Sequence, residues 1–385
     1  MNELKGFRVP QSRADIGEAE VEAVAHTLRS GWLTAGPAVH EFETAFQNFL
    51  GGSVDTIATS SASLGLMVAL KALGVGPGDE VITTTNTFVA TAMSAHHLGA
   101  KPVLVDIDSR TLTIDPERVE AAVTPRTRVV LPVHLGGLAC DMDAIHDIAT
   151  RHRLSVVEDA AHALPTTWRG RMVGAGASAA TVFSFYATKS ITTGEGGMIT
   201  TADPDLARRM RRLRQHGIDR DAFHRLNNSS WEYDVCEAGF KANMTDIAAS
   251  LGLVQLRKLD GMWRRRDQIA RRYRAALADL PVQLPAAPLP GDTHAWHLFI
   301  IQLLPDAPLG RDAFITAMNA RRIQCGVHYP PLHRHSFWRS TPDAEPGNFP
   351  EAEKVFSRTV TLPLFSAMSD EDVNYVVDAV RSLLT

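Results

Sequence analysis

Residues 181–201 read TVFSFYATKSITTGEGGMITT, which is two apolar runs on either side of a polar turn. The runs Thr181–Phe185 and Gly197–Thr201 have the length and the β-branched and aromatic content of strands. The turn carries Lys189 and, after it, the glycine-rich segment TTGEGGM. This stretch therefore predicts two strands of a sheet, with a lysine beyond the carboxyl end of the first.

The same kind of run recurs upstream. Short segments rich in Val, Ile and Thr alternate with amphipathic helical patterns, which is typical of a doubly wound α/β sheet. The five further predicted strands are Asp55–Thr59, Glu80–Thr84, Pro102–Asp106, Arg128–Val133 and Leu154–Glu158. Ligands of such sheets bind beyond the carboxyl ends of strands, so Asp159 and Ser184 are candidates for a site.

The pattern changes after about residue 249. The predicted elements there are an Arg-rich helix Gln255–Leu280, the Pro-rich segment 284–294, a strand His297–Leu303, and helices Arg311–Arg321 and Asp370–Leu384. A chain of 385 residues suits two domains. We predict a large α/β domain over residues 1–250 and a smaller α+β domain over 251–385, with about the first 25 residues free to pack on the smaller one.

Composition limits the function classes. Charged residues make up 21% of the chain and the net charge is −4, which gives no electrostatic reason to bind nucleic acid or an anionic membrane. The cysteines at 140, 236 and 325 have no paired spacing, so neither a disulfide framework nor a zinc site is expected. No apolar export segment or membrane span is apparent. We expect a cytoplasmic protein that handles small molecules.

Lys189 is the first candidate for chemistry. The other lysines lie on charged helix faces, in a turn or in polar segments, whereas Lys189 follows an apolar strand. Partial loss of water there would lower the pKa of its amine and free it to attack an aldehyde. From this position alone, an ordinary surface lysine remains an alternative.

Asp159 ends the strand in SVVEDAAHA, on what should be a neighbouring strand. A carboxylate there would pair with the pyridinium nitrogen of pyridoxal phosphate (PLP) and keep the ring electron-accepting. A helix N-cap is the alternative role, and both could hold at once.

The segment ATSSASLGL at 58–66 passes from a strand into a helix, where backbone N–H groups and hydroxyls can cradle a phosphate. Ser63, with the amide of Leu64, is the candidate ligand. Serine-rich turns also cap helices, so a plain cap is the alternative.

A family resemblance rests on motifs in a fixed order: TSSAS, GVGPGDEVIT, NTFVAT, PVHLGG, VEDAAHA, FSFYATKSITTGEGG, GFKANMTDIAASLGLVQL and GVHYPPLH. From about Val9 to the C-terminus the chain resembles the sugar aminotransferases of the DegT/DnrJ/EryC1/StrS family. HAWHLFII and GFKANMTDI are most similar to UDP-4-amino-4-deoxy-L-arabinose aminotransferases. The resemblance implies the PLP-dependent aspartate-aminotransferase fold (fold type I), with a mixed, mostly parallel seven-stranded sheet, and a homodimer with shared active sites.

The resemblance also assigns residues around the ring of the cofactor. Lys189 is the lysine that holds PLP as a Schiff base, and Asp159 is the partner of the pyridinium nitrogen. His162 stands beside the phenolic oxygen. Phe88 stacks on the ring, with a plain core phenylalanine as the alternative.

At the phosphate, the resemblance places Ser184 on one side and Ser63 with Leu64 on the other. The chain departs from the family pattern at Lys241, in GFKAN, where many members carry a tyrosine-containing segment. Lys241 is therefore expected to reach across the dimer to the phosphate, or to bind the diphosphate of the substrate.

His328 and Tyr329 match residues that approach the nucleotide sugar. His328, His333 and His335 lie close in sequence, but no carboxylate or cysteine completes a ligand set nearby, so no metal is expected.

The implied reaction has two halves. L-glutamate, the donor implied by the resemblance, displaces Lys189 from the cofactor, and the freed lysine moves a proton between the substrate and the cofactor. A nucleotide-linked 4-ketosugar, either a dTDP-4-keto-6-deoxyhexose or a UDP-4-keto-pentose, then accepts the amino group.

Two other functions are open. One is a PLP-dependent sugar dehydratase of the same fold, although those relatives carry His in place of Lys189. The other is a non-catalytic regulator, which would lack part of the catalytic set.

Overall fold

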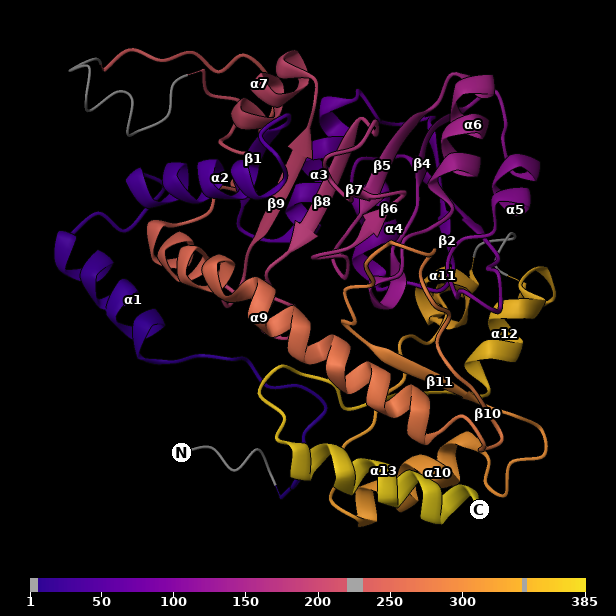
Figure 1. Cartoon of the computed structure of the whole chain (residues 1–385). Helices are drawn as coiled ribbons and strands as arrows, with labels where there is room; N and C mark the ends of the chain where they lie inside the picture. Colours follow the sequence, from indigo (N-terminus) through magenta and orange to yellow (C-terminus); the bar gives the residue numbers. More distant parts are fainter. Residues whose placement is uncertain (1–5, 220–230, 341–344) are drawn as a thin grey trace.

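The computed structural model describes residues 6–219, 231–340 and 345–385 (Figure 1). Its centre is a seven-stranded sheet. The seven strands predicted from the sequence are the strands of this sheet, and their ends differ from the prediction by no more than two residues. In spatial order they are β1 (Asp55–Thr59), β9 (Gly197–Thr201), β8 (Ala180–Ser184), β5 (Ser155–Asp159), β4 (Thr127–Leu131), β2 (Glu80–Thr84) and β3 (Lys101–Val105).

The sheet is mixed and mostly parallel, as expected for the fold. Only β9 runs antiparallel to its neighbours, β1 and β8, whereas the pairs from β8 to β3 are parallel. Asp159 at the end of β5 stands opposite Val182 of β8, two residues before Ser184. The two polar strand ends singled out in the sequence therefore meet at one edge of the sheet.

Alternate side chains of the strands enter two cores, one on each face of the sheet. Val182 and Ile199 pack under α3 (Ala62–Ala72) and α7 (Pro204–Leu213), with α4 (Val89–His96) on the same face. Their neighbours Phe183 and Met198 pack under α2 (Pro37–Phe49) and the start of α9 (Asp246–Ala276). Farther along that second face lie α5 (Pro116–Ala121) and α6 (Met142–His152). This alternation is the period of two that a strand imposes.

Phe46 provides a test of the second core. Its side chain is fully buried, and its ring lies edge-on to Phe183 and Phe185, with centroids 5.2 and 5.8 Å away. Phe46→Ala leaves a cavity that this packing cannot close, so we expect the free energy of unfolding to fall by about 3–5 kcal/mol. Denaturant unfolding checks this. Phe337→Ala, at a ring that is 47% exposed, is the control and should cost much less; equal losses would contradict the packing.

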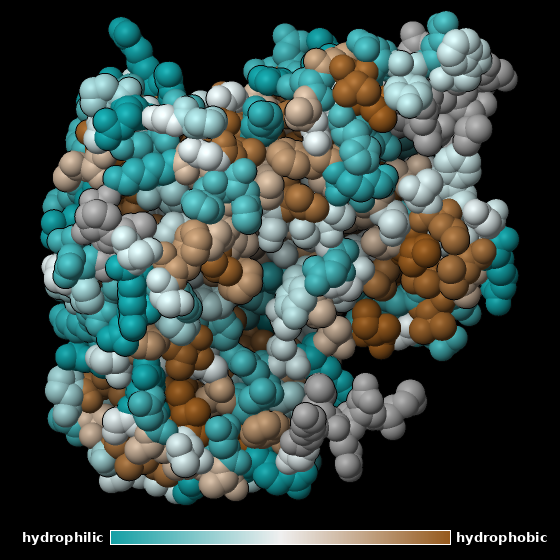
Figure 2. All heavy atoms as spheres, turned by 180° about the vertical axis from the view of Figure 1, so that it is seen from behind, coloured by the Kyte–Doolittle hydropathy of each residue, from teal (hydrophilic) through white to brown (hydrophobic). Residues whose placement is uncertain are grey.

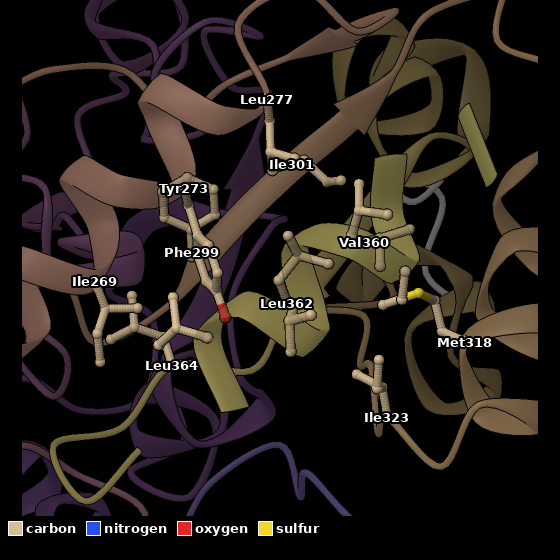
Figure 3. Close-up of a cluster of buried hydrophobic side chains, with 14 of the residues drawn as sticks. Ile269, Tyr273, Leu277, Phe299, Ile301, Met318, Ile323, Val360, Leu362 and Leu364 are labelled. Atoms are coloured by element: carbon tan, nitrogen blue, oxygen red, sulfur yellow. The ribbon is translucent and has the colours of Figure 1, made fainter. Parts of the chain in front are cut away.

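A second, antiparallel sheet is made of β10 (Val282–Gln283), β11 (Phe299–Leu303) and β12 (Thr359–Leu362). The end of α9, α10 (Arg311–Ala320) and α13 (Asp370–Leu384) surround its core, shown in Figure 3. In that core the Tyr273 hydroxyl donates to the backbone oxygen of Pro363 at 3.0 Å, which satisfies a polar group buried among apolar ones.

Helix α9 connects the core beneath α2 with the core of the small three-stranded sheet. It begins nine residues before the predicted Gln255, because Thr245 caps it by accepting a hydrogen bond from the N–H of Ala248. The helix therefore crosses the predicted boundary at residue 250, and the division into two domains stays a prediction. Near the N-terminus of the chain, the backbone of Val9 pairs with Ile323, and the Val9 side chain is buried in the core of the small three-stranded sheet.

The sequence pattern did not single out the remaining elements. They are α1 (Glu18–Ser30), η1 (Leu135–Gly137), β6 (Thr167–Trp168), β7 (Arg171–Met172), η2 (Leu332–Arg334), α11 (Ser336–Arg339), η4 (Pro346–Asn348) and α12 (Pro350–Phe356). Most are short. Within the described ranges, no helix combines the length and apolar character needed to cross a membrane.

Candidate active site

A cavity of about 530 Å³ opens at the carboxyl ends of β5 and β8, between the two sheets. Residues from both sheets line it. It brings together eight of the ten residues assigned to the site from the sequence: Ser63, Phe88, Asp159, His162, Ser184, Lys189, His328 and Tyr329. Leu64 and Lys241 do not line this cavity.

Lys189 lies in the turn after β8, where its backbone N–H donates to the oxygen of Tyr186 at 2.9 Å. Burial lowers the pKa of the Lys189 amine to about 8, and the nearby negative charge of Asp159 offsets this only in part. A lysine with a lowered pKa is a better nucleophile near neutral pH, because more of it is unprotonated.

Asp159 is 6% exposed and accepts two hydrogen bonds. The hydroxyl of Thr91 donates to Oδ2 at 2.8 Å, and the N–H of Ala161 donates to Oδ1 at 3.1 Å. Burial nevertheless raises the pKa of Asp159, against the effect of these bonds and of Lys189. A buried carboxylate stays charged at low cost only beside a cation. The site therefore fits a ligand that brings a positive charge to Asp159, as a pyridinium does.

The side chain of Glu158, the residue before Asp159, lies on the opposite face of β5. It lies 2.8 Å from Nε2 of His134 and accepts from the hydroxyl of Thr181 at 3.0 Å. Because Nδ1 of His134 accepts from the N–H of Cys140, the proton of the imidazole is on Nε2. Glu158 is thus satisfied beneath the sheet and does not line the cavity.

The turn before α3 also lines the cavity. Ser61 caps the helix and accepts from the N–H of Leu64 at 3.2 Å, so the amide of Leu64 is already bonded within the turn. The cap reading of this serine-rich turn therefore holds for Ser61. Ser63 lines the cavity, and helices leave their first N–H groups without helical partners. Donors at Ala62 and Ser63 suit a phosphate better than Leu64 does.

A glycine on β9 allows the strand to approach this turn. A Cβ at Gly197 would lie 2.7 Å from the nitrogen of Ala62. Any side chain there would push the strand away from the helix start. The glycine-rich segment after Lys189 thus allows β9 to pack closely against the turn before α3.

His162 is neutral and oriented. The N–H of Gly136 donates to its Nδ1 at 3.2 Å, so the imidazole proton is on Nε2, 3.3 Å from the Tyr329 hydroxyl. Burial and nearby Lys189 hold the pKa of His162 well below its usual range. His162 therefore presents an N–H donor to the cavity, as a group beside a phenolic oxygen needs to do.

Aromatic rings form one wall. Phe88 precedes α4, is 56% exposed, and its ring centroid lies 5.8 Å from that of Tyr329. Nδ1 of His328 lies 2.8 Å from the Thr361 hydroxyl, and burial lowers the pKa of His328 to about 4. These groups offer neutral hydrogen-bonding and stacking surfaces.

The histidines that lie close to His328 in sequence have other partners. His333 contacts Thr85 through Nδ1 at 2.7 Å and Glu353 through Nε2 at 2.7 Å. Nε2 of His335 lies 3.3 Å from the backbone oxygen of Pro330. Neither lines the cavity.

Lys241 is exposed, and its backbone pairs with Gln215. The backbone oxygen of the adjacent Ala242 accepts from the N–H of Ser60, at the start of the turn before α3. Lys241 thus lies near that end of the molecule, but outside the cavity of its own chain.

Several residues that line the cavity were not assigned to the site from the sequence, among them Gln11, Thr87, Thr91 and His297. Thr87 and Thr91 flank Phe88 in the quoted motif NTFVAT, and their hydroxyls lie 2.8 Å apart. The spacing of four across a helix start could have indicated that both face one side. Nothing local in the sequence marks Gln11.

Comparisons with known proteins agree with this geometry. The family model of the DegT/DnrJ/EryC1/StrS aminotransferase family matches residues 14–381. The chain is 46% identical to the spore coat polysaccharide biosynthesis protein SpsC of Bacillus subtilis, over 100% of this chain and 99% of SpsC.

Solved structures are similar over nearly the whole chain. Spr1654 from Streptococcus pneumoniae, assigned as a sugar aminotransferase and solved in its PMP form, has a TM-score of 0.91 and 34% identity, covering 98% of this chain and 99% of Spr1654. The sugar aminotransferase CalS13 from Micromonospora echinospora has a TM-score of 0.87 and 29% identity, covering 97% of this chain and 99% of CalS13.

The fold, the pairing of a lysine with a buried carboxylate in one cavity, and these matches lead to one assignment. PLP is the cofactor, and the residues around the cavity fit it. The chain belongs to the DegT/DnrJ/EryC1/StrS aminotransferase family.

Proposed function

We propose that this enzyme moves an amino group from L-glutamate to a nucleotide-linked 4-ketosugar, either a dTDP-4-keto-6-deoxyhexose or a UDP-4-keto-pentose, in the cytoplasm. The observation that carries the proposal is the cavity in which Lys189, Asp159 and His162 meet. Because Lys189 is present, transfer of an amino group is favoured over the dehydratase alternative, whose members have His there.

PLP, when bound, supplies an aldehyde that takes up an amino group and a ring that accepts electrons. Asp159, fixed by Thr91 and Ala161, would hold a proton on the ring nitrogen. Nε2–H of His162 would donate to the phenolic oxygen. The Lys189 amine, with its lowered pKa, would carry a proton to and from the substrate carbon. Ser63 and Ser184 would donate to the phosphate, and Phe88 would cover the ring.

The size and lining of the cavity support a sugar as acceptor. At about 530 Å³ it is within the usual range for small-molecule sites, and Tyr329 and His328 are among its lining residues. Relatives support the same class: SpsC is named for polysaccharide biosynthesis, and PseC of Helicobacter pylori for the biosynthesis of pseudoaminic acid.

We further propose a homodimer with shared active sites. Lys241 is exposed beside the phosphate turn and would reach the phosphate or the substrate diphosphate of the second copy. Phe88 and Tyr186, both at the cavity, are 56% and 46% exposed, which suits a mouth that another chain covers.

Helix α1 adds an apolar surface. Val21 and Leu28, one heptad apart, are 54% and 53% exposed. Figure 2 shows apolar residues gathered on the side of the molecule that carries α1. Exposed apolar patches of this kind mark protein interfaces. A single-chain mass in analytical ultracentrifugation at micromolar concentration would refute the dimer.

A substrate panel tests the function. The PLP enzyme is first treated with L-glutamate, which should convert it to the pyridoxamine form. Nucleotide-linked 3- and 4-ketosugars are then added one at a time, and recovery of the PLP absorbance is followed. We expect recovery with a 4-ketosugar nucleotide and an amino sugar as product. Loss of a sugar hydroxyl without gain of nitrogen would instead identify the dehydratase.

A further inference from the structure

We propose that Gln11 and His297 bind the ring of the acceptor sugar, through its hydroxyl or keto oxygens, and take no part in binding the amino donor. This inference rests on the proposed function and assigns a role to two further residues that line the same cavity. The two residues come from distant parts of the chain, an N-terminal segment and the segment just before β11.

Both side chains belong to residues that line the cavity, and each carries one polar atom without a partner. Among the described residues, neither Nε2 of Gln11 nor Nδ1 of His297 has a hydrogen-bond partner, although both atoms are buried. His297 as a whole is 6% exposed. An unpaired buried polar group is unfavourable, which favours a ligand that supplies a partner to these side chains.

The fold makes room for the Gln11 amide. A Cβ built on Gly326 would lie 2.2 Å from Nε2 of Gln11 and 2.8 Å from its Cδ. The backbone of Gly326 pairs with Thr361 in both directions, so this strand segment has no freedom to withdraw. Glycine at 326 is therefore required for the amide to lie where it does.

Gln11 is anchored to the side of the cavity formed by the second sheet. Its backbone N–H donates to Oε1 of Gln324 at 3.2 Å, and the N–H of Gln324 donates to the oxygen of Val9 at 2.9 Å. His297 lies on the same side, with its ring centroid 4.4 Å from that of His162. Gln11 and His297 thus stand on a wall that adjoins the reacting centre.

The charges of the residues that line the cavity indicate which substrate this wall binds. Of the described residues that line the cavity, Lys189 is the only Lys or Arg. Burial and the surrounding cations hold the pKa of His297 well below its usual range, so its imidazole is neutral. Carboxylates of an amino donor bind best to charged donors. A neutral amide and a neutral imidazole, one a donor and the other either donor or acceptor, match uncharged sugar oxygens instead.

The test separates the sugar ring from the rest of the substrate. Calorimetry on the PLP enzyme measures the affinity of dTDP-glucose against dTDP, and of UDP-glucose against UDP. For Gln11→Ala and His297→Ala, we expect about tenfold weaker binding of the sugar nucleotide that the enzyme prefers and unchanged binding of its nucleoside diphosphate. The rate of the half-reaction with L-glutamate should stay within about twofold of wild type.

Gly326→Ala is a second variant that leaves both functional side chains in the chain. Its methyl group displaces the flexible end of Gln11, so the same selective loss is expected. Gly261→Ala, in α9 with no atom within 4 Å of the added methyl, is the matched control and should bind like wild type.

Equal weakening for the sugar nucleotide and the diphosphate, a slowed glutamate half-reaction with unchanged sugar binding, or wild-type binding by all three variants would each overturn the assignment. A wild-type enzyme that fails to react with any amino donor would refute the proposed function instead.

Discussion

Lys189→Ala is expected to lower the rate of transamination by about 10⁴-fold. The variant loses the amine that holds PLP and the group that moves the proton, and no second lysine or arginine lines the cavity within the described ranges. Steady-state kinetics with the ketosugar identified in the panel measures the loss, and visible absorbance reports whether PLP is still held covalently.

The control for this variant is Lys354→Ala, at a side chain that is 51% exposed on α12. It should keep wild-type kinetics and absorbance. Turnover by Lys189→Ala within tenfold of wild type would show that another group does this chemistry.

Asp159→Asn should slow both half-reactions by about 10²–10³-fold. Asparagine keeps most of the shape and can still accept from Thr91, but it lacks the negative charge that holds a proton on the ring nitrogen. Single-turnover rates for L-glutamate and for the ketosugar measure the two halves separately.

Glu158→Gln is the matched control, because Glu158 is the adjacent carboxylate and faces His134 beneath the sheet. It should lower the thermal stability while leaving the single-turnover rates near those of wild type. If Asp159→Asn kept wild-type rates, or if Glu158→Gln slowed the reaction equally, the role given to Asp159 would be wrong.

The central sheet could be predicted from the sequence because most of its strands are buried on both faces. Continuous apolar runs such as TVFSF carry that signal locally. The start of α9 could not be predicted in this way. Asp246 and the residues after it pack on α2, so their helical pattern is not distinct from that of a buried segment. The two-residue strands β6, β7 and β10 are too short to leave a pattern.

Part of the candidate site could likewise be predicted from the sequence, and part could not. Lys189, Asp159 and Ser184 stand at strand ends, and parallel neighbours bring such ends together. The roles of His162 and Phe88 were predicted from the family resemblance. Gln11 and His297 are 286 positions apart, and only the packing of the N-terminal segment on the second sheet brings both to one wall.

Two further assignments could be judged only from the structure. The amide of Leu64 is used by the Ser61 cap, which a motif cannot reveal. Lys241 lies outside the cavity of its own chain, so the role proposed for it would require a second copy.

Chemical reduction of the PLP enzyme tests the central claim most directly. Borohydride fixes the bond between PLP and the lysine that holds it, and peptide mass spectrometry then locates the label. The predicted result is a phosphopyridoxyl group on Lys189. A label on any other lysine, or no label in an enzyme that contains PLP and is active, would contradict the account.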